Sequence, residues 1–325
     1  MLYETIIVLV KSLVMILVLF GFAAYMVLLE RVLMARMQMR LGPTRVGPIG
    51  LLQPIADGLK LLCKERFQPM GVEIFTFWLA PSLSLFLALS VFALIPVGGS
   101  VELWGRQISL RIADVNAGVL FLLAFSSLAV YGVVLAGWSS NNRYSLLGGL
   151  RGTAQMISYE IPMGISLLTV VLAAGTLSLP EIVEAQRNHW FIWTNPISFV
   201  IYLITAFAET NRAPFDLPEA EHELTAGYHT EYGGMKFAMF FLAEYINILA
   251  VSSIAVTLFF GGWLGPRDIP VVWFLLKVAV FVFFFMWVRA TMPRFRYDQL
   301  MTFGWKVLLP IAIINLIVTA YFTLV

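Results

Sequence analysis

The chain has 325 residues, of which 60% are hydrophobic and only 12% are charged, and its mean hydropathy is +0.87. Soluble domains contain about 45–50% apolar and about 25% charged residues, so this composition excludes a soluble globular protein and predicts an integral membrane protein. The 21 Lys and Arg residues nearly balance the 19 Asp and Glu residues, which argues against the basic surface of a nucleic-acid-binding protein.

Cysteine and histidine are too sparse for most metal and redox sites. Cys63 is the only cysteine, which excludes a disulfide framework, a four-thiolate zinc site and a cysteine-ligated iron–sulfur cluster within this chain. The three histidines lie apart, and no phosphate loop or dinucleotide fingerprint occurs. We therefore expect neither a metal site nor a redox centre in this chain.

Apolar stretches divide the chain into candidate membrane spans, each near the roughly 20 residues that a crossing helix needs. The first is a retained span, because Glu30-Arg31 follows it where a signal peptide would have small residues. The pattern predicts one all-α, polytopic membrane domain, residues 1–325, with about eight transmembrane helices. The expected spans are residues 6–29, 74–96, 114–137, 151–175, 194–209, 236–261, 270–292 and 304–324.

The distribution of Lys and Arg predicts the orientation of these spans. Fifteen of them fall in the segments after the first, third, fifth and seventh spans, and four fall on the other side. Because positively charged loops stay in the cytoplasm, both termini are expected on the outer, periplasmic side. Three inner loops, 30–73, 138–150 and 209–235, are long, and long loops in a compact domain are usually functional.

The first inner loop contains a predicted amphipathic helix of about four turns. Its apolar residues recur at helical spacing: Leu52, Ile55, Leu59 and Leu62. Asp57 and Lys60 are three residues apart on the polar face and would project to the same side. Such a helix suits the membrane surface rather than a crossing, either as a simple anchor or as a lid or floor under a cavity.

The other two inner loops differ in charge. The second, 138–150, is polar but almost uncharged, which favours a hydrogen-bonded turn. The third holds six acidic residues between Glu209 and Glu231 and one base, Arg212. Its acids lie close enough in sequence to raise one another's pKa, which favours proton uptake or pairing with a basic partner over a merely solvated charge run. These acids include Asp216, Glu219, Glu221 and Glu223.

Three further carboxylates lie in or at the predicted spans. Glu160 lies inside the fourth span shortly before Pro162, Glu244 lies inside the sixth, and Glu209 ends the fifth. A carboxylate at mid-bilayer costs about 2.5–3.5 kcal/mol on insertion scales, so it usually has a function or a partner. We expect a proton relay along these acids, with Lys277 as a candidate counter-charge. The alternative is that each is held in a structural ion pair.

Several long motifs together resemble one known family over essentially the whole chain. They are Arg40–Gly47, Gly137–Gly148, Ser158–Glu160, Glu209–Glu223 and Pro293–Met301, in that order. The sequence is similar to the membrane-subunit family that includes the H subunit of the proton-pumping NADH:quinone oxidoreductase, respiratory complex I, and subunit 1 of the mitochondrial enzyme. Two departures are minor: His222 interrupts the acidic stretch, and Val32 follows Glu30-Arg31.

The resemblance implies that the chain forms the membrane part of a quinone-binding chamber. It places a quinone path near Glu30, Arg31, Asp57 and Lys60. It assigns a coupling chain of carboxylates to Glu160, Glu209, Glu244, Asp216, Glu219, Glu221 and Glu223.

The same resemblance implies the surroundings of the chain. Quinone is the substrate, bound at the interface with peripheral subunits, while FMN and iron–sulfur clusters belong to partner subunits. The implied partners are the quinone-site subunits of the peripheral arm, small membrane subunits and antiporter-like subunits, in contact with membrane lipid. We expect the bacterial inner membrane, with the mitochondrial inner membrane less favoured.

Three other functions fit parts of the sequence. A stand-alone cation/proton transporter would also use intramembrane acids and a broken helix, but the sequence has no evident two-fold repeat. A passive anchor for the peripheral arm would pump normally without the buried acids. The membrane subunit of a related hydrogenase complex lies within the wider family, although the amino-acid sequences of the second and third inner loops favour the quinone enzyme.

Overall fold

The computed structural model describes residues 2–65, 67–103, 106–113, 115–218, 225–266 and 269–324. Within these residues, seven helical segments are long and apolar enough to cross a membrane, and a shorter apolar helix, α8, has 14 residues. The predicted all-helical membrane fold is therefore confirmed. The helices of the bundle are α1 (Leu2–Met37), α3 (Ile74–Phe92), α4 (Gly118–Ser139), α5 (Arg143–Ala174), the shorter α8 (Pro196–Glu209), α10 (Met235–Phe259), α11 (Pro270–Thr291), and the continuous run α12 (Tyr297–Phe303), η3 (Gly304–Leu308) and α13 (Leu309–Leu324).

Short elements occupy the connections between the membrane helices. The connection between α3 and α4 carries an antiparallel hairpin in which Val101 pairs with Ile108. No pattern in the sequence predicted this hairpin. The short elements are η1 (Pro48–Gly50), α2 (Gln53–Cys63), β1 (Ser100–Leu103), β2 (Arg106–Ser109), α6 (Leu179–Ala185), α7 (Phe191–Thr194) and η2 (Gly227–His229).

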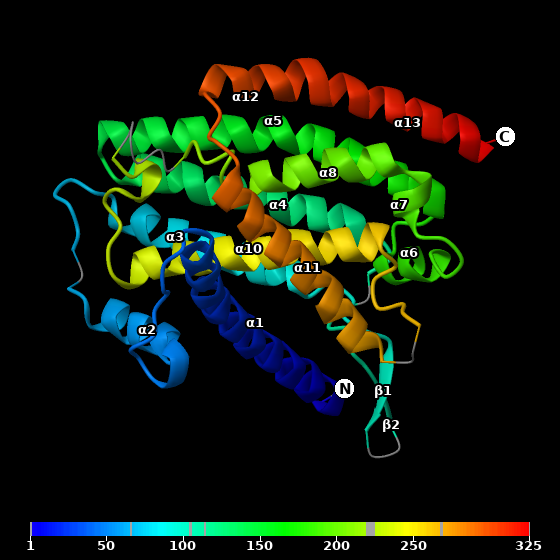
Figure 1. Cartoon of the computed structure of the whole chain (residues 1–325), viewed down its shortest axis with the longest axis horizontal. Helices are drawn as coiled ribbons and strands as arrows, with labels where there is room; N and C mark the ends of the chain where they lie inside the picture. Colours follow the sequence, from blue (N-terminus) through cyan, green and yellow to red (C-terminus); the bar gives the residue numbers. More distant parts are fainter. Residues whose placement is uncertain are drawn as a thin grey trace.

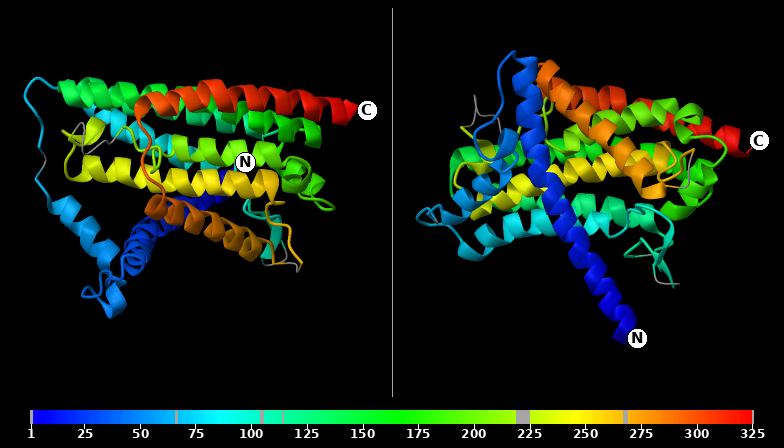
Figure 2. Two further views of the ribbon diagram at one scale, coloured as in Figure 1. Left: turned by 45° about the horizontal axis from the view of Figure 1, so that its top comes forward. Right: turned by 60° about the horizontal axis from the view of Figure 1, so that its bottom comes forward.

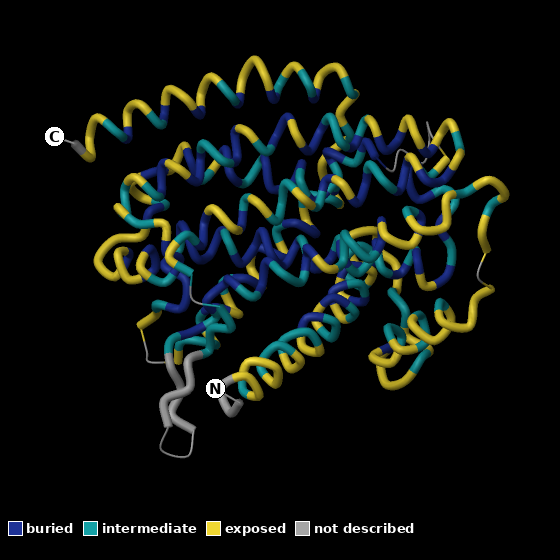
Figure 3. Tube along the Cα trace, turned by 180° about the vertical axis from the view of Figure 1, so that it is seen from behind, coloured by how far each residue is buried: buried dark blue, intermediate teal, exposed yellow. Residues whose placement is uncertain are grey.

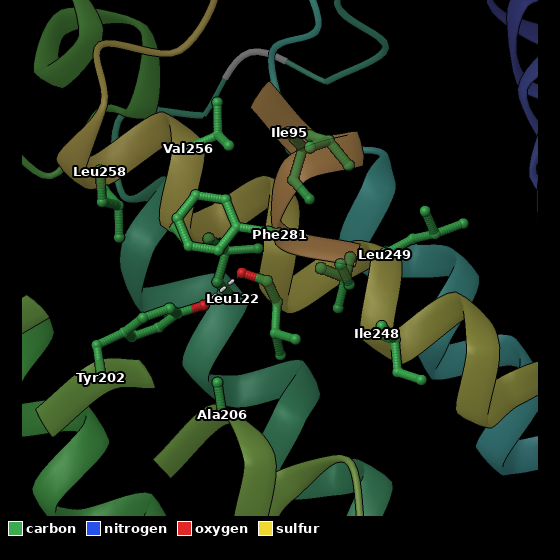
Figure 4. Packing of buried hydrophobic residues seen from close by; sticks show 14 of the residues in the cluster. Ile95, Leu122, Tyr202, Ala206, Ile248, Leu249, Val256, Leu258 and Phe281 are labelled. Atoms are coloured by element: carbon green, nitrogen blue, oxygen red, sulfur yellow. Dashed lines mark hydrogen bonds between the residues drawn. The ribbon is translucent and has the colours of Figure 1, made fainter. Parts of the chain in front are cut away.

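The helices α3, α4, α5, α8 and α10 run side by side and form the centre of the bundle, with α12 and α13 along one flank (Figure 1). Figure 3 shows buried residues concentrated where these helices face one another. Figure 4 shows part of this core, where the Tyr202 hydroxyl donates to the Val251 carbonyl at 2.8 Å. Burial of apolar surface against neighbouring helices thus fixes the frame that positions the polar groups described below.

Helix α1 crosses the bundle obliquely, and its N-terminal half diverges from the other helices (Figure 2). Leu9, Leu13 and Leu17 are 65%, 60% and 62% exposed, whereas Ala23 is completely buried. The N-terminal half of α1 thus presents an apolar surface suited to lipid chains or apolar helices. The C-terminal half packs against α10 and α11.

Several helices extend beyond the expected spans. The expected second inner loop, 138–150, is mostly helical, because α4 continues to Ser139 and α5 begins at Arg143. The side chain of Asn142 caps α5 by accepting a hydrogen bond from the Tyr144 amide at 2.9 Å. The polar residues after the cap form the first turns of a 32-residue helix rather than a loop. In the same way, α1 continues to Met37 and α12 begins at Tyr297.

The start of α1 and the end of α13 lie at the same end of the bundle as the hairpin and α6, opposite α2 (Figure 1). This arrangement agrees with termini on one side of the membrane. The assignment of that end to the periplasmic side stays a prediction from the charge distribution.

Candidate functional site

Charged side chains from three helices and one loop meet where the C-terminal parts of α1 and α11 approach the N-terminal half of α10. We call this group the central charged cluster. It consists of Glu30 on α1, Arg212 in the loop after α8, Glu244 and Tyr245 on α10, and Arg289 in the last turn of α11.

Arg212 lies between the two carboxylates of the central charged cluster. Its Nη1 atom is 3.3 Å from Oε1 of Glu30, and its guanidinium also pairs with Glu244. The same guanidinium lies 4.5 Å from the ring centroid of Tyr245. Burial by itself would lower the pKa of Arg212, but the neighbouring Glu244 and Glu30 carboxylates raise it above its ordinary value. Arg212 is thus a permanent buried cation.

Glu30 has three donors within the same cluster. Besides Arg212, the Arg289 guanidinium pairs with its Oε1 atom, and the Tyr245 hydroxyl donates to Oε2 at 2.6 Å. The side chain of Glu30 is only 6% exposed, whereas that of Arg289 is 34% exposed. A buried carboxylate requires such partners, because an unpaired charge is costly to remove from water. Glu30 is therefore held in the cluster by these three donors.

Two small cavities lie beside Glu209, and one of them also reaches Glu244. One cavity of about 40 Å³ is lined by both carboxylates and by Asn247. A second cavity of about 40 Å³ is lined by Glu209, Asn247 and the core residue Tyr202. Since one water needs at least about 10–15 Å³ of such volume, each cavity has room for roughly two to three waters beside polar partners. Water can therefore bridge the two carboxylates.

Glu160 continues this line on α5. Its carboxylate accepts a hydrogen bond from Ser127 of α4, and it interacts electrostatically with Glu209. Glu209 also lies beside Ser126, the neighbour of Ser127. The structure thus places Glu160, Glu209 and Glu244 in succession, as the relay hypothesis requires, while their role in proton transfer stays a prediction.

The described part of the acidic loop folds back onto the bundle. The buried Gln155 side chain donates to the carbonyls of Ala208 and Phe215 at 2.8 and 2.7 Å. Arg294 donates to the Asp216 carbonyl, and Asp216 lies close enough to Glu244 to interact with it electrostatically. These contacts hold Arg212 and Asp216 beside the relay. The predicted sites Glu219, Glu221 and Glu223, with His222, lie outside the described residues.

The predicted quinone-path residues fall into two places. Arg31 pairs with Asp57 at 2.7 Å, with side chains 48% and 28% exposed, and Gln53 donates to Asp57 at 3.0 Å. Lys60 is exposed on the same short helix, α2. Glu30 is instead turned inward to the central charged cluster, so α1 joins the two groups through adjacent residues.

Helix α2 has the amphipathic character that the sequence predicts, over 11 rather than about 14 residues. Its apolar face includes Ile55, Leu59 and Leu62, which are 56%, 57% and 60% exposed. An apolar face that this chain leaves uncovered suits the membrane surface or a partner.

Lys277 is not the counter-charge of the relay. Its ammonium donates to the carbonyls of Phe260, Gly262 and Leu264 at 2.7, 3.0 and 2.7 Å, beyond the C-terminal end of α10. The counter-charge is Arg212, which the sequence marked only as the single base of an acidic loop. No sequence signal pointed to Arg289, which lies 259 residues from Glu30.

Metal binding has no support in the described part of the chain, where no three His, Cys, Asp or Glu side chains gather in a suitable group. Cys63 is exposed and unpaired with another cysteine. The chemistry that the cluster and the cavities support is proton binding and charge compensation.

Comparison with known proteins identifies the family. The NADH dehydrogenase family matches residues 10–320. The H subunit of the NADH-quinone oxidoreductase of Protochlamydia amoebophila is 79% identical over 306 residues, which are 94% of each chain. The first-numbered H subunit of the same enzyme in Geobacter metallireducens is 55% identical over 299 residues, covering 92% of this chain and 91% of the relative. The H subunit of the Thermomicrobium roseum enzyme is 53% identical over 309 residues, with the same two coverages.

The match extends over almost the whole chain and includes every residue of the central charged cluster. The chain therefore belongs to the NADH dehydrogenase family, together with the H subunits of the NADH-quinone oxidoreductases.

Proposed function

We propose that this chain is the membrane subunit of a proton-translocating NADH:quinone oxidoreductase that forms the membrane part of the quinone chamber and couples quinone reduction to proton translocation. Its family membership and membrane helices support the subunit assignment. The observation that carries the coupling role is the unbroken series of ionisable groups from Glu160 through Glu209 and Glu244 to Arg212 and Glu30.

The quinone path in this proposal lies beside α2, at the inner membrane surface. Arg31, Asp57 and Lys60 there would guide the polar quinone headgroup, while the uncovered apolar face of α2 suits its lipid-soluble tail. Glu30 precedes Arg31 directly on α1 and belongs to the central charged cluster. A change of charge in the chamber would thus act on the cluster over a short distance, where electrostatic interactions are strong.

The coupling step in this proposal is electrostatic. Reduction of a quinone to a quinol consumes protons, so it changes the charge balance next to the acidic loop and Glu30. Because buried carboxylates are sensitive to neighbouring charge, Glu244, Glu209 and Glu160 would then gain or lose protons in turn. Water in the two cavities would carry protons between them.

The rest of the machinery lies in partner subunits. Electrons would arrive from FMN and iron–sulfur clusters in the peripheral arm, whose quinone-site subunits would dock on the inner loops. Small membrane subunits and antiporter-like subunits would continue the relay. The bacterial sources of the relatives support a bacterial inner membrane, with both termini in the periplasm.

A stand-alone transporter and a hydrogenase subunit are not favoured, because the relatives compared above are named as NADH-quinone oxidoreductase subunits. A passive anchor is the remaining competitor. It differs from the proposal only in giving the buried carboxylates no part in pumping.

The first test is to tag the chain in its native host and extract it in mild detergent. We expect a complex of several hundred kilodaltons that carries flavin, iron–sulfur signals and inhibitor-sensitive NADH:quinone activity. A stable particle of one or two copies without redox centres would overturn the subunit assignment.

The second test replaces the buried acids in the assembled enzyme. We expect Glu160→Gln and Glu244→Gln to lower the number of protons pumped per electron, measured in vesicles. Glu184→Gln is the matched control, since Glu184 is 44% exposed in an outer surface ion pair with Arg187. Normal pumping by both buried variants would favour the passive anchor.

A further inference from the structure

The central charged cluster contains two carboxylates and two guanidinium groups, but their partners are shared unequally. Within the described residues, Glu30 pairs with both Arg212 and Arg289 and accepts from Tyr245. Glu244 has Arg212 as its ion-pair partner there. The two carboxylates therefore share one arginine, and in the described part of the chain Glu30 has a second basic partner, Arg289.

Arg212 contacts the two carboxylates with different nitrogens. Its Nη1 atom lies 3.3 Å from Glu30, while its Nε atom pairs with Glu244. Arg289 also pairs with Glu30. By compensating Glu30, Arg289 leaves Arg212 free to compensate Glu244.

Arg289 is also partly exposed at the surface of this chain, where groups outside the cluster can contact it. Its side chain is 34% exposed, whereas Glu30 and Arg212 are each 6% exposed. A gap of about 10 Å³ lies among Glu30, Arg212 and Arg289. The Arg212 guanidinium already contacts both carboxylates, so a small rotation can favour one of them while the positive charge is kept.

We propose that Arg289 is a positioning residue for the relay, which determines through Glu30 whether Arg212 compensates Glu244. This inference rests on the proposed function. When negative charge on the exposed side of Arg289 draws its guanidinium from Glu30, Arg212 shifts toward Glu30. Glu244 then loses its cation and accepts a proton from the Glu209 side through the cavity water. When Arg289 returns to Glu30, Arg212 returns to Glu244, and the proton leaves toward Glu209.

Charge-balance variants of the assembled enzyme test this inference. Arg289→Gln removes one positive charge, Glu30→Gln removes one negative charge, and the double variant again leaves one arginine and one carboxylate. Each single variant should lower the protons pumped per electron about twofold or more. The double variant should pump no better than Glu30→Gln, because Arg212 then has no second carboxylate to move to. A merely structural ion pair would instead give rescue, because the double variant removes both partners together.

The control is Arg296→Gln, in the link that follows α11. Arg296 is 73% exposed and pairs with Asp298 at 2.5 Å, so its removal should leave the proton ratio unchanged. Electron input is measured separately, as NADH oxidation by a soluble acceptor per flavin. This measurement separates loss of assembly from loss of coupling.

A fourth variant covers failure of Arg289→Gln to assemble. Arg289→Lys keeps the charge but loses the planar fork, so its proton ratio should fall between wild type and Glu30→Gln. Wild-type pumping by Arg289→Gln, or a double variant that recovers the wild-type proton ratio, would overturn the inference. Absence of quinone-linked pumping in the unsubstituted enzyme would instead overturn the proposed function.

Discussion

The buried Arg212 and the partly buried Lys277 are two cations that lie near different ends of α10, and their partners differ. Arg212 lies between two carboxylates on α1 and α10, beside the basic Arg289 of α11. Lys277 donates to three backbone carbonyls just beyond the last residue of α10 and lies 5.0 Å from the Trp190 ring. One cation is held by groups that can change their charge, and the other by groups that cannot.

This difference suits Arg212 to a role in coupling and Lys277 to a structural role. Backbone carbonyls at the end of a helix carry fixed partial negative charge, so the Lys277 contacts remain the same whatever happens to protons nearby. Carboxylates lose their attraction for a cation when they are protonated. A cation is therefore suited to a switch only where its partners titrate, as those of Arg212 do.

The largest expected effect follows removal of the cation from the central charged cluster. Arg212→Met leaves Glu244 buried without its ion pair, and breaking a buried pair in this way costs about 3–5 kcal/mol. We expect a severe loss of assembled, active complex, measured on native gels and as quinone-linked NADH oxidation. Arg212→Lys should retain more complex, because it keeps the charge. Normal assembly and activity of the Met variant would contradict the role assigned to Arg212 and thus its distinction from Lys277.

Removal of the outer cation should act on stability alone. Lys277→Met deprives three carbonyls of their donor, and an unsatisfied buried polar group costs about 1–3 kcal/mol. We expect a lower unfolding temperature of the complex, while the protons pumped per electron stay unchanged in the enzyme that assembles. If the proton ratio fell instead, Lys277 would belong with Arg212 and the distinction would fail.

His229 adds a third case to the comparison of Arg212 with Lys277, because it is a buried base that packs among aromatic rings. Its imidazole centroid lies 3.8 Å from the Tyr228 ring and 5.4 Å from the Phe240 ring. Burial lowers the pKa of His229 to about 3, so the folded protein holds it neutral whereas the unfolded chain protonates it below about pH 6.5. Its contribution to stability is therefore complete above that pH and is lost as the pH falls toward 3.

The measurement is the pH dependence of thermal unfolding in the complex. Between about pH 7.5 and about pH 5.5, this histidine alone should lower stability by about 1 kcal/mol. His229→Gln should remove that part of the pH dependence, and His189→Gln serves as the control because His189 is exposed. An identical pH dependence in wild type and His229→Gln would show that His229 is not held neutral.

The smallest effect on stability is expected at the exposed counterpart of the buried cluster. The Arg31–Asp57 pair is substantially exposed, and exposed ion pairs contribute about 0–1 kcal/mol. Asp57→Asn should leave assembly unchanged but raise the KM for quinone more than it lowers kcat, since it alters the proposed quinone path. Steady-state kinetics with a short-chain quinone provide the check, and an unaltered KM would exclude Asp57 from the path.

The sequence predicted the elements that depend on local pattern. The bounds of α10 and α11 lie within two residues of the expected spans, and α2 has its predicted amphipathic faces. The structure also places Glu160, Glu209 and Glu244 near one another, while their part in a relay stays a prediction. These inferences need only the residues near each position.

Contacts between distant segments could not be predicted in this way. Arg212 and Glu30 are 182 residues apart, and Glu30 and Arg289 are 259 apart, so no periodic pattern connects them. Lys277 was assigned to the wrong partners because the sequence shows its charge but not the carbonyls that turn toward it. The second inner loop was misjudged because the cap at Asn142 begins a helix in residues that are polar enough for a turn.

The central charged cluster also sets the order in which the protein can mature in the membrane. Glu30 emerges with the first helix, but Arg289, its close partner, is synthesised 259 residues later. At about 5–20 residues per second, translation takes on the order of 13 to 50 s to cover that interval. During this time Glu30 lacks its Arg289 partner, so the central charged cluster is completed only after α11 has been synthesised.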